Sequence, residues 1–187
     1  LSCYPAIDPG RTSVIYNGID AAEYRPDPGT AVLERHGIDP ARLSVVFVGR
    51  ITRQKGLSHL LDAGSAIDPE AQLVLCAGAA DTPELASEIA AKLAALRATR
   101  GNVIWIEEML PKPDLIQILS HATVFVCPSV YEPMGIVNLE AMACETAVVA
   151  TAVGGIPEVV DDGVTGVLIP YEAQADGTGT PVDPAGL

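Results

Sequence analysis

Residues 123–142 read Thr-Val-Phe-Val-Cys-Pro-Ser-Val-Tyr-Glu-Pro-Met-Gly-Ile-Val-Asn-Leu-Glu-Ala-Met. The first five form a short apolar run rich in β-branched side chains, which is typical of a strand buried on both faces of a parallel sheet. Pro128, Pro133 and Gly135 then mark a loop, and a helical pattern begins at Ile136. The order strand, loop, helix is the repeating unit of an α/β fold.

The same unit recurs along the chain. A leader is expected to hold a short strand at 14–16 and a small helix near 30–36. Strands separated by helices require right-handed crossovers, so the predicted fold is a Rossmann-like parallel sheet with helices on both faces. The strands are expected at 44–49, 72–77, 102–106, 123–128, 147–151 and 165–169, and the helices near 56–66, 82–99, 111–121, 136–144 and 155–161.

Length and composition suit one domain. The chain has 187 residues, of which 49% are hydrophobic, enough for a single sizeable core. We expect this domain to span residues 1–170. Residues 171–187 lack any periodicity and are expected to form a mobile tail. The chain opens on Leu1 rather than Met, which indicates a fragment of a longer protein.

Charge and motifs exclude several classes of protein. A net charge of -13 without a basic cluster argues against nucleic acid or an anionic membrane as partner. No apolar run approaches the roughly 18 residues of a membrane span and no signal peptide is visible, so we expect a cytoplasmic protein. The cysteines lack metal-site spacing, and the glycine patterns of dinucleotide and ATP sites are missing, so neither a metal nor a cofactor is expected.

Two acids, Glu132 and Glu140, flank the start of the helix that begins at Ile136. We expect Ile136 to Glu140 to lie in its first turn, where amides have no intrahelical partner and can hold phosphate or sugar oxygens. Gly135 lets the backbone approach a ligand closely. The carboxylates would then accept hydrogen bonds from sugar and ribose hydroxyls. The alternative is that both acids only complement the helix macrodipole.

Two cations follow the strand at 44–49. Gly49 ends this strand, and Arg50 and Lys55 lie in the loop that leads to Gly56. Arginine can bind a diphosphate through two parallel hydrogen bonds, and lysine can bind it as a point charge. Loop cations are ordinarily only solvated. In so acidic a chain, however, a phosphate ligand requires cations concentrated where it binds, and open α/β sheets bind ligands at the carboxyl ends of their strands.

These motifs together resemble the C-terminal, donor-binding domain of GT-B retaining glycosyltransferases of the family 4 type, in a form similar to actinobacterial glycogen synthases. The resemblance covers Val14 to Pro170. The motifs that carry it are Gly49-Arg50, Gln54-Lys55-Gly56, Pro128-Ser129, Glu132-Pro-Met-Gly135 through Glu140-Ala-Met142, and Gly154-Gly-Ile-Pro-Glu158.

The resemblance implies a role for each of these residues. Arg50 and Lys55, beside Gly49, would bind the diphosphate of a nucleoside diphosphate glucose, commonly ADP-glucose, and stabilise the leaving group. Glu132 would bind the transferred glucose, and Glu140 the ribose. The amides of Gly135, Ile136 and Val137 would bind the sugar or the phosphates. The base would lie between Gly78 and the segment Ile106-Glu-Glu-Met109. Arg50, Lys55 and Glu132 would be the catalytic residues.

The resemblance also implies a missing half. Residues 1–20 include the end of an interdomain linker, and the N-terminal domain that binds the glucan or sugar acceptor is absent from this chain. We therefore expect the isolated chain to bind donor weakly and to transfer no sugar. Two alternatives stay open: a sugar-nucleotide epimerase of the same fold, although the loop at 49–56 offers cations and no carboxylate, and a non-catalytic nucleotide-binding module.

Overall fold

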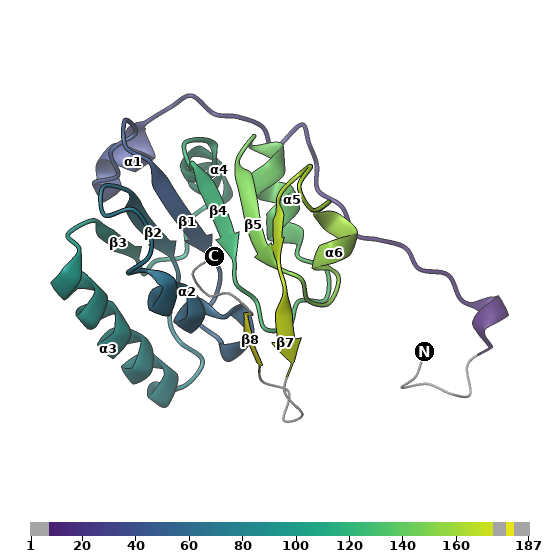
Figure 1. Cartoon of the computed structure of the whole chain (residues 1–187). Helices are drawn as coiled ribbons and strands as arrows, with labels where there is room; N and C mark the ends of the chain where they lie inside the picture. The colour runs from purple at the N-terminus through teal and green to yellow at the C-terminus, as the bar shows by residue number, and fades with distance from the viewer. Residues whose placement is uncertain (1–7, 174–178, 182–187) are drawn as a thin grey trace.

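The computed structural model describes residues 8–173 and 179–181. Its main sheet is parallel throughout, with the strand order β3-β2-β1-β4-β5-β6 (Figure 1). All six expected strands are confirmed, with ends that shift by no more than two residues. The strands are β1 (Ser44–Val48), β2 (Gln72–Cys76), β3 (Val103–Ile106), β4 (Val124–Cys127), β5 (Ala147–Thr151) and β6 (Val167–Ile169).

Helices cover both faces of this sheet, as the sequence predicts (Figure 1). They are α1 (Ala31–His36), α2 (Leu57–Ala63), α3 (Pro83–Thr99), α4 (Lys112–Ser120), α5 (Ile136–Ala143) and α6 (Ile156–Val159), with short 3-10 turns η1 (Pro9–Arg11) and η2 (Arg53–Lys55).

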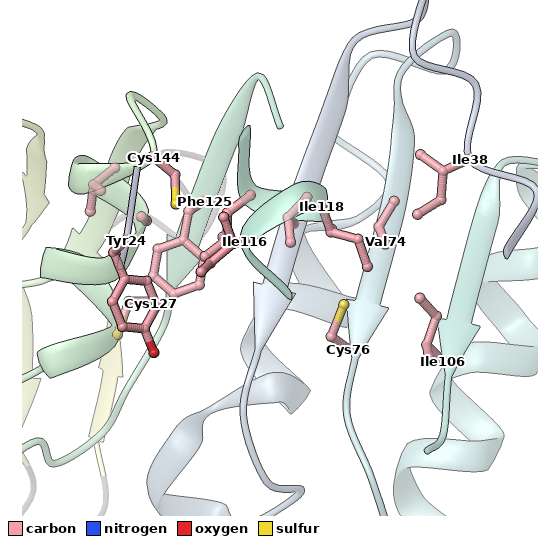
Figure 2. Close-up of a cluster of buried hydrophobic side chains, with 14 of the residues drawn as sticks. Tyr24, Ile38, Val74, Cys76, Ile106, Ile116, Ile118, Phe125, Cys127 and Cys144 are labelled. Atoms are coloured by element: carbon pink, nitrogen blue, oxygen red, sulfur yellow. The ribbon is translucent and has the colours of Figure 1, made fainter. Parts of the chain in front are cut away.

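Alternate residues of each strand enter two separate cores, because successive side chains of a strand point to opposite faces. In β1, Phe47 packs with α2 and α3, whereas Val46 packs with α1, α4, α5 and α6. Figure 2 shows part of the second core, in which Phe125 of β4 lies beside Ile116 of α4. Strands buried on both faces explain why their sequences are continuous apolar runs.

Local signals fix the ends of several helices. Thr82 caps α3: its hydroxyl oxygen accepts from the Leu85 amide at 3.2 Å, and Pro83 occupies the first helical position. Gly37 ends α1 in the left-handed conformation, with φ of 69°. The helix expected at 56–66 ends sooner, at Ala63.

The strand order puts a switch point between β1 and β4. From β1 the chain continues to β2 and β3 on one side, and β4 leads to β5 and β6 on the other. The loops after β1 and β4, which are neighbours in the sheet, therefore diverge, and open α/β sheets bind ligands at such a switch point. The two loops at this point are those that carry Lys55 and Glu132.

Two expectations at the ends of the chain differ from the structure. Residues 14–16 form no strand: they have no regular secondary structure, and Ile15 is 90% exposed. The segment after Pro170 does contain regular structure, since β7 (Tyr171–Ala173) pairs antiparallel with β8 (Gly179–Pro181). Residues 174–178 and 182–187 of the expected tail, and residues 1–7 of the expected domain, lie outside the described residues.

Candidate functional site

The loops after β1 and β4 are joined to one another. The Val130 amide donates to the Gln54 carbonyl at 2.8 Å. The first loop is itself held by Thr52, whose hydroxyl oxygen accepts from the Lys55 amide at 3.1 Å and so caps η2. The backbone therefore fixes where Lys55 stands relative to the second loop.

Lys55 and Glu132 form an ion pair across this junction. Lys55 Nζ lies 2.5 Å from Glu132 Oε2, and the two side chains are only 23% and 10% exposed. Water screens a pair at this depth poorly, so the attraction is stronger than in a surface salt bridge. The sequence assigned both residues to one pocket, and the structure brings them into contact, 77 positions apart.

Glycines allow the loops to approach so closely. A Cβ on Gly56 would lie 1.8 Å from the Pro128 carbonyl oxygen, and one on Gly154 would lie 1.9 Å from that of Glu132. The Gly155 amide donates to the same Glu132 carbonyl at 2.9 Å. The loop after β5 thus supports the Glu132 loop, a role that sequence reasoning missed, although two adjacent glycines after a strand are a visible signal of close backbone approach.

Arg50 lies apart from this pair, toward β2. Its Nη1 is 3.5 Å from Asp81 Oδ1, and the two side chains are 69% and 50% exposed. Such an exposed ion pair is worth little, so a ligand can take the guanidinium at small cost. Gly49 precedes Arg50 and lies beside Lys55: its amide donates to the Cys76 carbonyl at 3.1 Å, and a Cβ there would lie 3.7 Å from Lys55 Cγ.

The α5 N-terminus opens beside Glu132. Gly135 precedes it with φ of 80° and supplies no side-chain cap, so the amides of Ile136 and Val137 have no intrahelical partner. Glu140 was expected in the first turn, and this is wrong: it is the fifth residue of α5 and lies in the second turn. The macrodipole acts mainly within the first turn, so this position weakens the alternative interpretation of Glu140 as a dipole acid.

Tyr24 is a neighbour of Glu140 that sequence reasoning missed. It is 7% exposed and packs in the same core as Ala141 and Cys144 of α5. Burial raises the pKa of its phenol, and a hydrogen bond to Glu140 raises that pKa further. The aromatic side chain thus connects the segment before α1 to one of the two predicted sugar-binding acids.

A cavity of about 350 Å³ lies where the base was expected. Gly78, Trp105 and Glu107 line it, and the Trp105 indole donates to the Ala77 carbonyl at 2.8 Å, which fixes the ring. Met109 is not among the lining residues and is 91% exposed. The structure therefore brings Gly78 and Glu107 together at this cavity and leaves Met109 outside it.

The buried thiols offer no nucleophile. Burial raises the pKa of Cys76 to about 12, and it also raises the pKa of Cys127. Both remain protonated at neutral pH, and the thiolate is the reactive form. Within the described part of the chain, no group of three or more His, Cys, Asp or Glu side chains is placed to hold a metal ion, and no helix is long and apolar enough to cross a membrane.

The chain spans about half or less of the length of the curated relatives it matches. It is 57% identical over 176 residues to the alpha-maltose-1-phosphate synthase of Mycolicibacterium smegmatis, covering 92% of this chain and 46% of that protein. It is 35% identical over 162 residues to the D-inositol 3-phosphate glycosyltransferase of Mycolicibacterium gilvum, covering 87% of this chain and 36% of that protein.

A solved structure shares the fold. The crystal structure of Anabaena HepE in complex with UDP and glucose superposes with a TM-score of 0.77 at 27% identity, covering 96% of this chain and 46% of that one. The model of the family "Glycosyl transferases group 1" matches residues 31–177, which contain both site loops. The chain therefore belongs to the group 1 glycosyl transferases and has the fold of one half of a GT-B enzyme.

Proposed function

We propose that this chain is the donor-binding half of a retaining, family 4 type glucosyltransferase that uses a nucleoside diphosphate glucose, with ADP-glucose as the expected donor. The observation that carries the proposal is the Lys55–Glu132 ion pair at the switch point of the sheet. Uncapped amides at the start of α5, and a cavity lined by residues that follow β1, β2 and β3, lie at the same edge of the sheet. The HepE complex, in which a related protein holds UDP and glucose, supports a donor of this class.

Each group has a role in this proposal. Lys55 and Arg50 bind the diphosphate, and their charge stabilises the leaving group as negative charge grows on it. Glu132 accepts hydrogen bonds from the glucose, Glu140 accepts them from the ribose, and the amides of Ile136 and Val137 bind phosphate or sugar oxygens. Gly78 and Glu107 flank the base. The leaving phosphate takes the acceptor's proton on the front face of the sugar, so no protein nucleophile is needed.

The donor is tested by isothermal titration of this chain with ADP, UDP and GDP. We expect ADP to bind most tightly, and we expect Asp81→Ala, which frees Arg50 from its partner, to bind ADP at least as tightly as the unaltered chain. Tighter binding of UDP would move the donor to UDP-glucose and leave the other assigned roles intact. Binding of none of the three nucleotides would contradict the donor-binding role itself.

The acceptor is tested in the full-length protein. The name of the 57% identical relatives describes a disaccharide phosphate, which one glucosyl transfer to glucose 1-phosphate would form. The resemblance to glycogen synthases instead points to a glucan. We expect transfer from ADP-glucose to glucose 1-phosphate to exceed transfer to glycogen at equal concentrations of acceptor ends. Faster labelling of glycogen would make the glucan the acceptor, and release of an epimerised nucleotide sugar would favour the epimerase alternative.

A further inference from the structure

Asn138, the third residue of α5, carries a buried amide whose only hydrogen-bonding contact among the described residues is with the Cys127 thiol. The side chain is 0% exposed, and neither Nδ2 nor Oδ1 has any other hydrogen-bond partner among the described residues. A buried donor or acceptor without a strong hydrogen bond lowers the stability of the fold. Such groups are rare in folded proteins, so this one requires a reason.

The amide lies near the Glu132 side chain. A Cβ built on Gly135 would lie 2.6 Å from Asn138 Nδ2 and 3.5 Å from Glu132 Cγ, so both side chains flank one point. The other polar neighbour is the Cys127 thiol, and its contact with the Asn138 side chain acts to lower the pKa of that thiol, but a thiol is a weak hydrogen-bonding group. The Asn138 amide is therefore held near the side chain of Glu132 with no strong hydrogen bond to lose.

Donor binding creates a need for that hydrogen bond. If Lys55 moves to a diphosphate, Glu132 loses its cation while only 8% of the residue is exposed to water. Removing one partner of a buried ion pair leaves an uncompensated charge, and this is strongly unfavourable. A nearby neutral donor reduces that cost and gives up only a weak contact with the Cys127 thiol.

We propose that Asn138 is a positioning residue whose side-chain amide donates a hydrogen bond to the Glu132 carboxylate when Lys55 turns to the donor diphosphate. The inference rests on the proposed function. The proposal gives a reason for this buried amide: the amide allows Lys55 to leave Glu132 and bind the ligand. Asn138 itself touches neither the sugar nor the phosphates.

The test is a double-mutant cycle with bare ADP and UDP as probes, because no sugar hydroxyl can then substitute for the amide. Asn138→Leu has a similar branched shape but no donor. We expect it to weaken nucleotide binding about tenfold, as loss of one hydrogen bond to a charged group would. In a Glu132→Gln background, residue 132 has no charge to compensate. There we expect Asn138→Leu to change nucleotide affinity by less than about twofold.

Stability gives the second readout. Removing an unsatisfied amide should leave the thermal midpoint of Asn138→Leu unchanged or raised, whereas a structural hydrogen-bonding role would lower it. A second cycle with Asn138→Ala controls for any steric effect of the leucine side chain. Suppose that the Asn138 variants lose the same affinity whether residue 132 is Glu or Gln, and that Lys55→Ala still weakens nucleotide binding. This result would overturn only the role of Asn138. No nucleotide binding by the unaltered chain would instead defeat the proposed function.

Discussion

Lys55→Ala in the full-length protein should lower kcat by about 100- to 1,000-fold, with a much smaller change in KM. Removal of one preorganised charge-stabilising donor typically costs a factor of this size. The charge that Lys55 stabilises grows as the diphosphate leaves, so the lost interaction is worth more in the transition state than in the bound donor. Steady-state kinetics with the donor varied at saturating acceptor would measure both constants.

Lys92→Ala is the matched control for this variant. Lys92 Nζ also lies 2.5 Å from a carboxylate, Asp62 Oδ2, but it bridges α2 and α3 away from the two loops. We expect kcat within about twofold of the unaltered enzyme, because an exposed pair contributes about 0–1 kcal/mol and touches no ligand. An effect of Lys55→Ala confined to KM would contradict leaving-group stabilisation.

Gly56→Ala should destabilise the domain by about 3 kcal/mol or more. The residue has φ of 65°, which costs an alanine roughly 1–2 kcal/mol, and the new Cβ would meet the Pro128 carbonyl oxygen. The obstacle is backbone, not the end of a flexible side chain, so the loops after β1 and β4 must separate. Urea denaturation followed by circular dichroism would give the free energy of unfolding.

Gly37→Ala measures the cost of the left-handed backbone for alanine without the steric contact that Gly56→Ala adds. Gly37 has nearly the same backbone, with φ of 69°, but a Cβ there would meet nothing within 4 Å. We expect a loss of roughly 1–2 kcal/mol, which is the conformational cost alone. If the two alanines cost the same, close contact between the loops would not be what requires glycine at position 56.

Much of the fold could be predicted because strands buried on both faces read as continuous apolar runs. Thr123 to Cys127 is such a run, and its strand is where it was expected. Val14 to Tyr16 has the same character but no neighbouring strand, and hydrogen bonding across a sheet, not local preference, decides whether such a run becomes a strand. The β7–β8 pair was missed because its residues alternate too briefly to show a period.

The candidate site was predictable at the level of loops and not of atoms. Lys55 and Glu132 each follow a core strand, so a common edge of the sheet could be expected. Their ion pair depends on which strands are neighbours, and Tyr24 and Asn138 act through tertiary packing that no motif records. The turn that holds Glu140 depends on where α5 starts, and helix boundaries are uncertain by a few residues from sequence.

Because Lys55 is already neutralised by Glu132, we expect the site to discriminate among anions. Inorganic sulfate or phosphate would have to separate Lys55 from Glu132, and its negative charge would then repel the unpaired Glu132 carboxylate. A sugar diphosphate brings its own hydroxyl donors to Glu132 at the same moment. We therefore expect inorganic sulfate and phosphate to compete more weakly than a nucleotide or nucleotide sugar, whose additional contacts offset the cost of separating Lys55 from Glu132.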